Sequence, residues 1–300
     1  MSRIIEWFKN IEQAWDGFWF TPRDGRTLGL IRLLTGAIVL YMLITWTSLL
    51  EVFLGSDGLL PNDYATQFYD STFAWSHLNW FDSSGALYTI HVIGIVIVGL
   101  FTCGFWTRVT GPITALLVIS YSNRATGATF GLDQIAGFLT LYLSFSDCGQ
   151  SFSLAKRLGL GAKQGRASVR NNIAIRLIQI HLCIVYMFAG LGKCQGETWW
   201  NGEAIWGTMA SYEYQTLDMT WMAEAMWLVS LITMVVMFFE TFYVALIWPK
   251  LTRPVMLLLA IPMHLGIGVC MGMMEFGLIM LIANLAFVEF GKTERSPAIE

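Results

Sequence analysis

Eight apolar stretches, separated by short polar segments, limit what this chain can fold into. Four of them contain 20 or more residues, enough for an α-helix to cross the roughly 30 Å hydrocarbon core of a bilayer. They lie at about 28–50, 86–105, 110–121, 132–145, 172–193, 222–248, 255–270 and 276–290. We therefore expect an all-α fold, a polytopic membrane helix bundle with about eight transmembrane helices.

Composition agrees with a membrane protein. Apolar residues make up 55% of the 300 positions and charged residues 13%, and the 13 Trp and 20 Phe are typical of aromatic belts at bilayer surfaces. The net charge is −3 without a basic block, which gives no indication of nucleic-acid binding. The five cysteines show no metal-ligand spacing, so no metal site is predicted, and a bridge between Cys194 and Cys270 is left open.

The chain divides into three predicted segments. Residues 1–24 have apolar side chains at helical spacing and charged side chains on the opposite face, the pattern of an interfacial amphipathic helix. Residues 25–292 form the transmembrane domain, and residues 293–300 form a short cytoplasmic tail. Arg32 lies inside the first apolar stretch, where we expect its side chain to extend to the headgroups.

Charge distribution predicts an orientation. With a cytoplasmic N-terminus and eight crossings, most Lys and Arg residues between the stretches lie inside, while the acidic loops 51–84 and 195–219 lie outside. Both termini are then cytoplasmic. Because no organelle signal is visible, we expect the cell inner (cytoplasmic) membrane of a bacterium.

Two basic residues, Arg124 and Lys193, fall at the outer ends of helices instead. The third and fourth stretches are short, so their connection 122–131 would lie below the outer surface, where irregular backbone requires a protein or water-filled cavity. This predicts an outward-facing polar cavity with Asn123, Arg124 and Asp133 on one side and Lys193 on another. The alternative is a plain surface loop, if the third helix begins at Thr107 and does span.

Three ionisable residues in the later stretches are candidates for chemistry, because such groups are costly in a membrane. A lysine buried at a cavity has its charged form disfavoured, which makes Lys193 a usable base. Glu240 is either functional or a structural group that bonds another helix or Arg253. His264 follows Pro262, and its ring is either functional or the partner of a carbonyl freed by the kink.

A resemblance to a known family is carried by the run from Gln179 to Lys193, with its Tyr186-x-x-Ala-Gly-x-x-Lys193 pattern, followed by Trp199-Trp200-Asn-Gly202. It extends to Ser122-Asn123-Arg124 and to Thr252-Arg253-Pro254 before His264. These motifs are similar to those of the HTTM (horizontally transferred transmembrane) family, which includes vitamin K-dependent gamma-glutamyl carboxylase. Residues 25–292 thus resemble an HTTM domain.

The resemblance implies an activity, cofactors and site residues. Lys193 would be the base that deprotonates reduced vitamin K or menaquinol, which then reacts with dioxygen, giving a strong base for carboxylation by carbon dioxide. Arg124 and His264 would assist in catalysis. Asn123, Tyr186, Trp199 and Trp200 would line the site for the lipid quinone.

Departures from the carboxylase change the expected substrate. Asn123-Arg124 stands where the carboxylase has an asparagine-histidine pair, and Gly192 stands where it has a second lysine. The chain stops at Glu300, whereas the carboxylase continues into a large extracytoplasmic portion that helps to bind its propeptide. These differences argue for a compact enzyme that acts on a small or peptide substrate at the outer face.

Two other classes of function remain. A non-catalytic accessory protein for maturation or export of a secreted peptide would use Lys193 and Arg124 to pair with Glu197, Glu203 or a partner's acid. A transporter would show an internal repeat, and the two halves show none. The expected partners are membrane lipid, a lipid quinone and a secreted peptide or partner protein.

Overall fold

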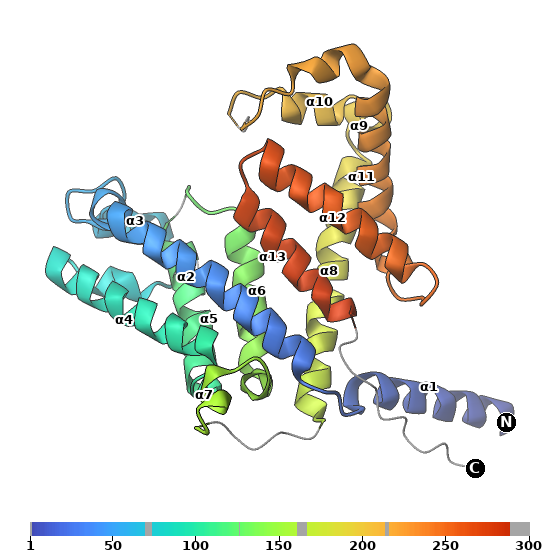
Figure 1. Cartoon of the computed structure of the whole chain (residues 1–300), viewed down its shortest axis with the longest axis horizontal. Helices are drawn as coiled ribbons and strands as arrows, with labels where there is room; N and C mark the ends of the chain where they lie inside the picture. The colour runs from blue at the N-terminus through green and yellow to red at the C-terminus, as the bar shows by residue number, and fades with distance from the viewer. Residues whose placement is uncertain (1, 70–73, 126, 161–166, 214–215, 289–300) are drawn as a thin grey trace. The chain divides into compact units, whose positions relative to one another are not determined.

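The computed structural model consists of helices (Figure 1). It describes residues 2–69, 74–125, 127–160, 167–213 and 216–288. Within these ranges it has α-helices α1 to α13, four 3₁₀ helices and no strand, and an isolated bridge pairs Arg23 with Ser168. The predicted all-α helical bundle is confirmed. The predicted tail, 293–300, lies outside the described residues.

The described residues form two compact units. Unit 1 takes the described part of Met1–Ile178 together with Val288, and unit 2 is Gln179–Phe287. The helices of unit 1 are α1 (Ser2–Phe20), α2 (Arg26–Leu54), α3 (Asn62–Tyr69), η1 (His77–Trp80), α4 (Ser84–Cys103), α5 (Thr107–Arg124), α6 (Gly131–Ser144), η2 (Cys148–Gln150), α7 (Leu154–Arg157) and the first part of α8 (Val169–Lys193). Its core lies among α2, α4, α5 and α6, where buried side chains include Leu43, Leu50, Leu87, Val98 and Leu117.

Unit 2 contains the rest of α8 and the helices that follow it. These are α9 (Glu197–Trp200), α10 (Ala204–Met209), η3 (Thr220–Ala225), α11 (Met226–Leu246), α12 (Arg253–Cys270), α13 (Met274–Asn284) and η4 (Leu285–Phe287). A small apolar cluster of Ile205, Met222 and Val229 packs α10 and η3 against the start of α11. This cluster covers the N-terminal end of α11.

Five helices among the described residues are long and apolar enough to cross a membrane. They are Arg26–Leu54, Ser84–Cys103, Val169–Lys193, Thr220–Leu246 and Arg253–Cys270. The other three predicted stretches also form helices, namely α5, α6 and the shorter apolar helix Met274–Phe287. The chain is therefore a helical membrane protein, and the number of eight crossings stays a prediction.

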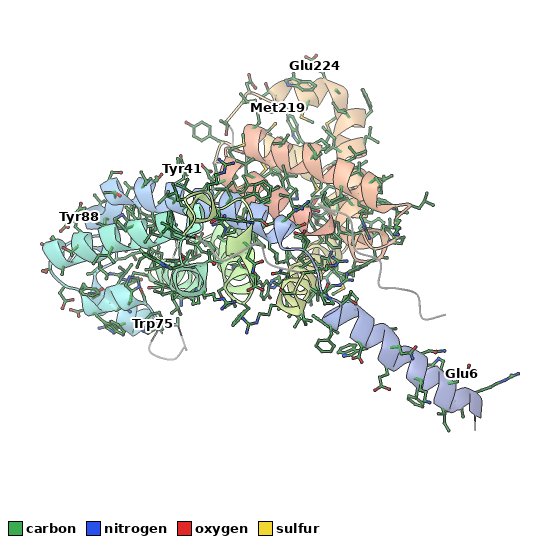
Figure 2. All side chains as sticks on the ribbon, turned by 60° about the horizontal axis from the view of Figure 1, so that its bottom comes forward. Glu6, Tyr41, Trp75, Tyr88, Met219 and Glu224 are labelled. Atoms are coloured by element: carbon green, nitrogen blue, oxygen red, sulfur yellow. The ribbon has the colours of Figure 1, made fainter. Side chains whose placement is uncertain are left out.

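The N-terminal helix α1 is exposed along most of its length. All side chains from Arg3 to Gly17 are exposed, including apolar ones such as Ile4 and Trp15, and Figure 2 shows Glu6 on this projecting helix. Its C-terminal end is held by Asn172 Nδ2, which donates to the carbonyl of Phe18 at 2.6 Å. The helical prediction is met as far as Phe20, and the interfacial location stays a prediction.

Arg32 is buried, so the expectation that it extends to the headgroups is wrong. Its side chain is fully buried, and its guanidinium donates to the carbonyl oxygens of Phe101 at 2.9 Å, Phe152 at 2.6 Å and Ser151 at 3.3 Å. Phe101 lies in the last turn of α4, where its carbonyl also accepts from the backbone nitrogen of Gly104 at 2.9 Å. The arginine thus joins the end of α4 to the backbone at 151–152, and the carbonyl groups in turn compensate the cost of burying its charge.

Arg32→Met is expected to lower the unfolding temperature of the full chain strongly. Each hydrogen bond from a charged donor contributes roughly 1.5–3 kcal/mol, so losing the set costs about 3 kcal/mol or more. Thermal unfolding in detergent measures the change. Arg26→Met is the control, because Arg26 is half-exposed and pairs only with Asp24. Equal losses in the two variants would contradict this role for Arg32.

Candidate functional site

In unit 2, helices α8 and α11 meet at a glycine. Tyr186, Gly190 and Lys193 lie four and three residues apart, so they share one face of α8. A Cβ added to Gly190 would lie 2.5 Å from the backbone nitrogen of Thr241 and 2.8 Å from the carbonyl carbon of Glu240. Only glycine permits such an approach, the usual device for close helix packing in membranes.

The close approach brings together a lysine and a glutamate. Lys193 Nζ lies 2.6 Å from Glu240 Oε2, and their side chains are 23% and 11% exposed. The pairing offsets much of the cost of placing each charge away from water. Lys193 is also the last residue of α8, where the helix dipole favours a cation. Of the structural partners left open for Glu240, the structure shows one on another helix, Lys193; a functional role for Glu240 stays a prediction.

Other pairings that the sequence left open are not formed. Arg253 donates to the carbonyl oxygens of Ile247 and Trp248 at the end of α11, instead of pairing with Glu240. Glu197 and Glu203, proposed as partners of Lys193, are both exposed. Within the chain, the acidic partner of Lys193 is therefore Glu240, and the pairing with a partner's acid that the accessory role allows stays a prediction.

Two tryptophans predicted for the site lie beside the lysine. The centroid of the Trp199 ring is 5.0 Å from Lys193 Nζ, close enough for a cation–π interaction. Trp200 Nε1 donates to the carbonyl of Cys194 at 2.7 Å, and its side chain is 60% exposed. Both tryptophans lie in α9, just after the end of α8, but only Trp199 contacts the charged amine.

A second buried group joins Tyr186 to α12 and α13. Tyr186 Oη lies 2.5 Å from His264 Nε2 and receives a hydrogen bond from Asn284 Nδ2 at 3.2 Å. Tyr243 Oη donates to Asn284 Oδ1 at 2.7 Å. All four side chains are at most 4% exposed. We call Tyr186, Tyr243, His264 and Asn284 the tyrosine–histidine network.

The sequence reasoning found only part of this site. Tyr186 and His264 were predicted, whereas Tyr243 and Asn284 were missed. A signal for each was present: Asn284 is a polar residue inside an apolar stretch, and Tyr243 lies one turn after Glu240 on the same helix face. The pairing of Lys193 with Glu240 had no local signal, because the residues lie on different helices.

The predicted residues of unit 1 form a separate arrangement. Asn123 and Arg124 lie in the last turn of α5, so their prediction as part of an irregular connection is wrong. Because α5 begins at Thr107 and has 18 residues, it is about 27 Å long, close to the hydrocarbon thickness. The alternative of a plain surface loop required the third helix to begin at Thr107, and this requirement is met.

Arg124 and Asn123 bind described residues of the segment between α2 and α4. Arg124 is 1% exposed, and its Nη2 donates to the carbonyl of Leu60 at 2.5 Å and to Asn62 Oδ1 at 3.0 Å. Asn123 Nδ2 donates to the carbonyl of Trp75 at 2.9 Å. Asp133 Oδ2 accepts from the backbone nitrogen of Phe130, which caps α6. Since Arg124 and Lys193 belong to different units, the shared cavity stays a prediction.

His77 also joins the segment before α4 to α5, and it was missed by the sequence reasoning. Its Nδ1 lies 2.6 Å from Ser120 Oγ, and its backbone nitrogen donates to the same oxygen at 3.0 Å. Burial lowers the pKa of His77 below its ordinary value, because a charged imidazole loses hydration there. The folded chain therefore favours the neutral ring.

The lowered pKa of His77 predicts a pH dependence of stability. Below about pH 6.5 the unfolded chain binds a proton that the folded chain resists, so stability falls as the pH drops through this range. We expect wild type to lose more of its unfolding temperature between about pH 7.5 and pH 5 than His77→Asn, which keeps a polar group near the Nδ1 position. Equal losses would contradict the prediction.

Metal and disulfide chemistry find no support in the part of the chain that the structure describes. There, no three His, Cys, Asp or Glu side chains lie together as a metal site. Cys194 and Cys270 are both free, so the bridge left open between them is not formed. Cys194 Sγ lies 3.6 Å from Thr241 Oγ1 instead.

Comparison with known families decides the classification. A family model for the HTTM domain matches residues 20–291. The chain belongs to the HTTM domain family. Searches of curated proteins and of solved structures found no match. The matched range includes residues of both units, and the predicted resemblance to the HTTM family is confirmed.

Gly190→Ala is expected to destabilise this HTTM protein, because the added methyl group would clash with the backbone of α11 and separate Lys193 from Glu240. Such overpacking costs roughly 1–3 kcal/mol. Thermal unfolding in detergent measures the loss. Gly192→Ala is the matched control, since a Cβ at Gly192 meets no atom within 4 Å. Similar unfolding temperatures for both variants would contradict the close approach at Gly190.

Proposed function

We propose that this chain is an integral membrane enzyme related to vitamin K-dependent gamma-carboxylase, in which Lys193 acts as the base that activates a reduced quinone. The observation that carries the proposal is the Lys193–Glu240 pair: an amine at the end of an apolar helix, held 2.6 Å from a carboxylate and next to an aromatic ring. Membership of the HTTM family supports it.

The residues around Lys193 fit a lipid-soluble hydroquinone. Trp199 adds an aromatic ring beside the amine. When bound, a hydroquinone supplies two electrons and two protons, so that with dioxygen it yields a quinone epoxide and water.

The carboxylate of Glu240 can accept a proton from Lys193. As an ion pair, the ammonium of Lys193 has no free electron pair with which to act as a base. Transfer of one proton from Nζ to Oε2, across 2.6 Å, leaves a neutral amine and a neutral carboxylic acid. In the proposal this neutral pair is the reactive form, because its amine has a free electron pair. The amine then accepts a proton from the bound hydroxyl group.

The remaining predicted residues enter the proposal with supporting roles. Tyr186 and His264 join α8 to α12, while Asn123 binds Trp75 and Arg124 binds Leu60 in unit 1. With the predicted orientation, Lys193 faces the outer side of the cell inner membrane. Carbon dioxide and a small or peptide substrate would be used there, after the quinone has reacted.

A non-catalytic accessory protein for maturation or export of a secreted peptide is the second candidate. One observation favours it: Lys193 already has an acidic partner within the same unit, as a structural ion pair would. The accessory function requires no reaction with a quinone, which separates the two candidates.

The first test supplies the purified full chain, in lipid, with dioxygen and either vitamin K hydroquinone or menaquinol. We expect quinone epoxide, detected by mass spectrometry, and a fall of about 100-fold or more in Lys193→Ala. Glu240→Gln should also be impaired, because an amide cannot accept the proton. Lys250→Ala is the matched control, since Lys250 is an exposed lysine of the same unit.

The outcomes discriminate between the candidates. Full epoxide formation by Lys193→Ala would exclude Lys193 as the base. No epoxide from folded wild type with either hydroquinone would favour the accessory function, and copurification of a dedicated partner would then support it.

A further inference from the structure

The tyrosine–histidine network has a defined hydrogen-bond direction. Asn284 Nδ2 lies 2.9 Å from the carbonyl oxygen of Met280, which can only accept, so the amide orientation is settled. Asn284 Oδ1 therefore receives the hydroxyl hydrogen of Tyr243. The second hydrogen of Nδ2 points to the oxygen of Tyr186.

This direction determines which nitrogen of His264 carries the proton. The oxygen of Tyr186 accepts from Asn284, and the acceptor that the described residues offer to its own hydroxyl hydrogen is His264 Nε2, 2.5 Å away. An Nε2 that accepts must be unprotonated. The ring is therefore neutral with its hydrogen on Nδ1.

The Nδ1–H group of His264 is a buried donor. The His264 side chain is 2% exposed, and Nδ1 has no hydrogen-bond partner among the described residues. Its ring lies near the rings of Tyr186 and Phe276, at centroid distances of 5.9 and 6.4 Å. A buried donor without an acceptor is costly and rare, so it indicates a group that the protein alone does not provide.

We propose that His264 Nδ1–H binds a carbonyl oxygen of a lipid-soluble quinone. One neutral N–H group among aromatic side chains suits a neutral acceptor better than an anion, because no positive charge is present to compensate it. The choice of a quinone rests on the proposed function, whereas the buried donor does not. His264 is then a ligand-binding residue, and Tyr186 and Asn284 are positioning residues that keep its proton on Nδ1.

The test is infrared spectroscopy of oxidised menaquinone, labelled with ¹³C at its carbonyl groups and bound to the full chain in lipid. We expect one carbonyl band to lie at lower wavenumber than in protein-free lipid, because a hydrogen bond weakens the C=O bond. His264→Phe should abolish this shift and weaken binding roughly 3- to 10-fold, as expected for the loss of one hydrogen bond.

Matched variants isolate the donor. Tyr243→Phe removes a hydroxyl group from the same network but leaves the Tyr186–His264 bond, so the shift should remain. His264→Asn places an amide N–H near the position of Nδ1 and should keep part of the shift. If His264→Phe fails to fold, a comparison of His264→Ala with His264→Asn tests the same donor.

An unshifted carbonyl band in wild type, or a shift that persists in His264→Phe, would overturn the proposal. Lys193→Ala should retain the shift, because oxidised quinone needs no base to bind. A shifted band without epoxide formation would thus contradict the proposed reaction but support the binding site. Epoxide formation without a shifted band would contradict only the binding site.

Discussion

Buried charge is the constraint on which this structure depends. Water does not solvate polar groups in the hydrocarbon region, so the protein has to satisfy them internally. Arg32 meets this constraint with backbone carbonyls at the end of α4, and Arg124 meets it with Leu60 and Asn62. Lys193 and Glu240 meet it with each other. In each case the partners belong to different segments of the chain, so every buried charge also joins helices or loops.

Much of the fold was predictable, because long apolar stretches in sequence have few alternatives to membrane helices. All eight predicted stretches form helices. Lys193 could be selected as a candidate from the sequence, because a lysine is costly in a membrane helix. Arg32 was misjudged by the same reasoning. The snorkelling rule considers a single helix, whereas the end of α4 and the loop at 151–152 supply the acceptors.

The partners within the site were not predictable, for a different reason. Glu240 is 47 positions after Lys193, and a single sequence does not show which helices pack together. Gly190 was visible only as part of a family motif; its physical function, contact with the backbone of Thr241, required the helix pair. The network around Asn284 depends on four residues from α8, α11, α12 and α13, so no local pattern defines it.

The glycine contact between α8 and α11 also determines how far Lys193 can move along the membrane normal. A lysine near the end of a membrane helix ordinarily adjusts its height by bending its flexible side chain toward water. Here the helix backbone is held against α11 one turn earlier, and the amine is held by Glu240. The depth of the amine in the bilayer is therefore a property of the helix pair, and variation in lipid thickness would act on it only by moving both helices together.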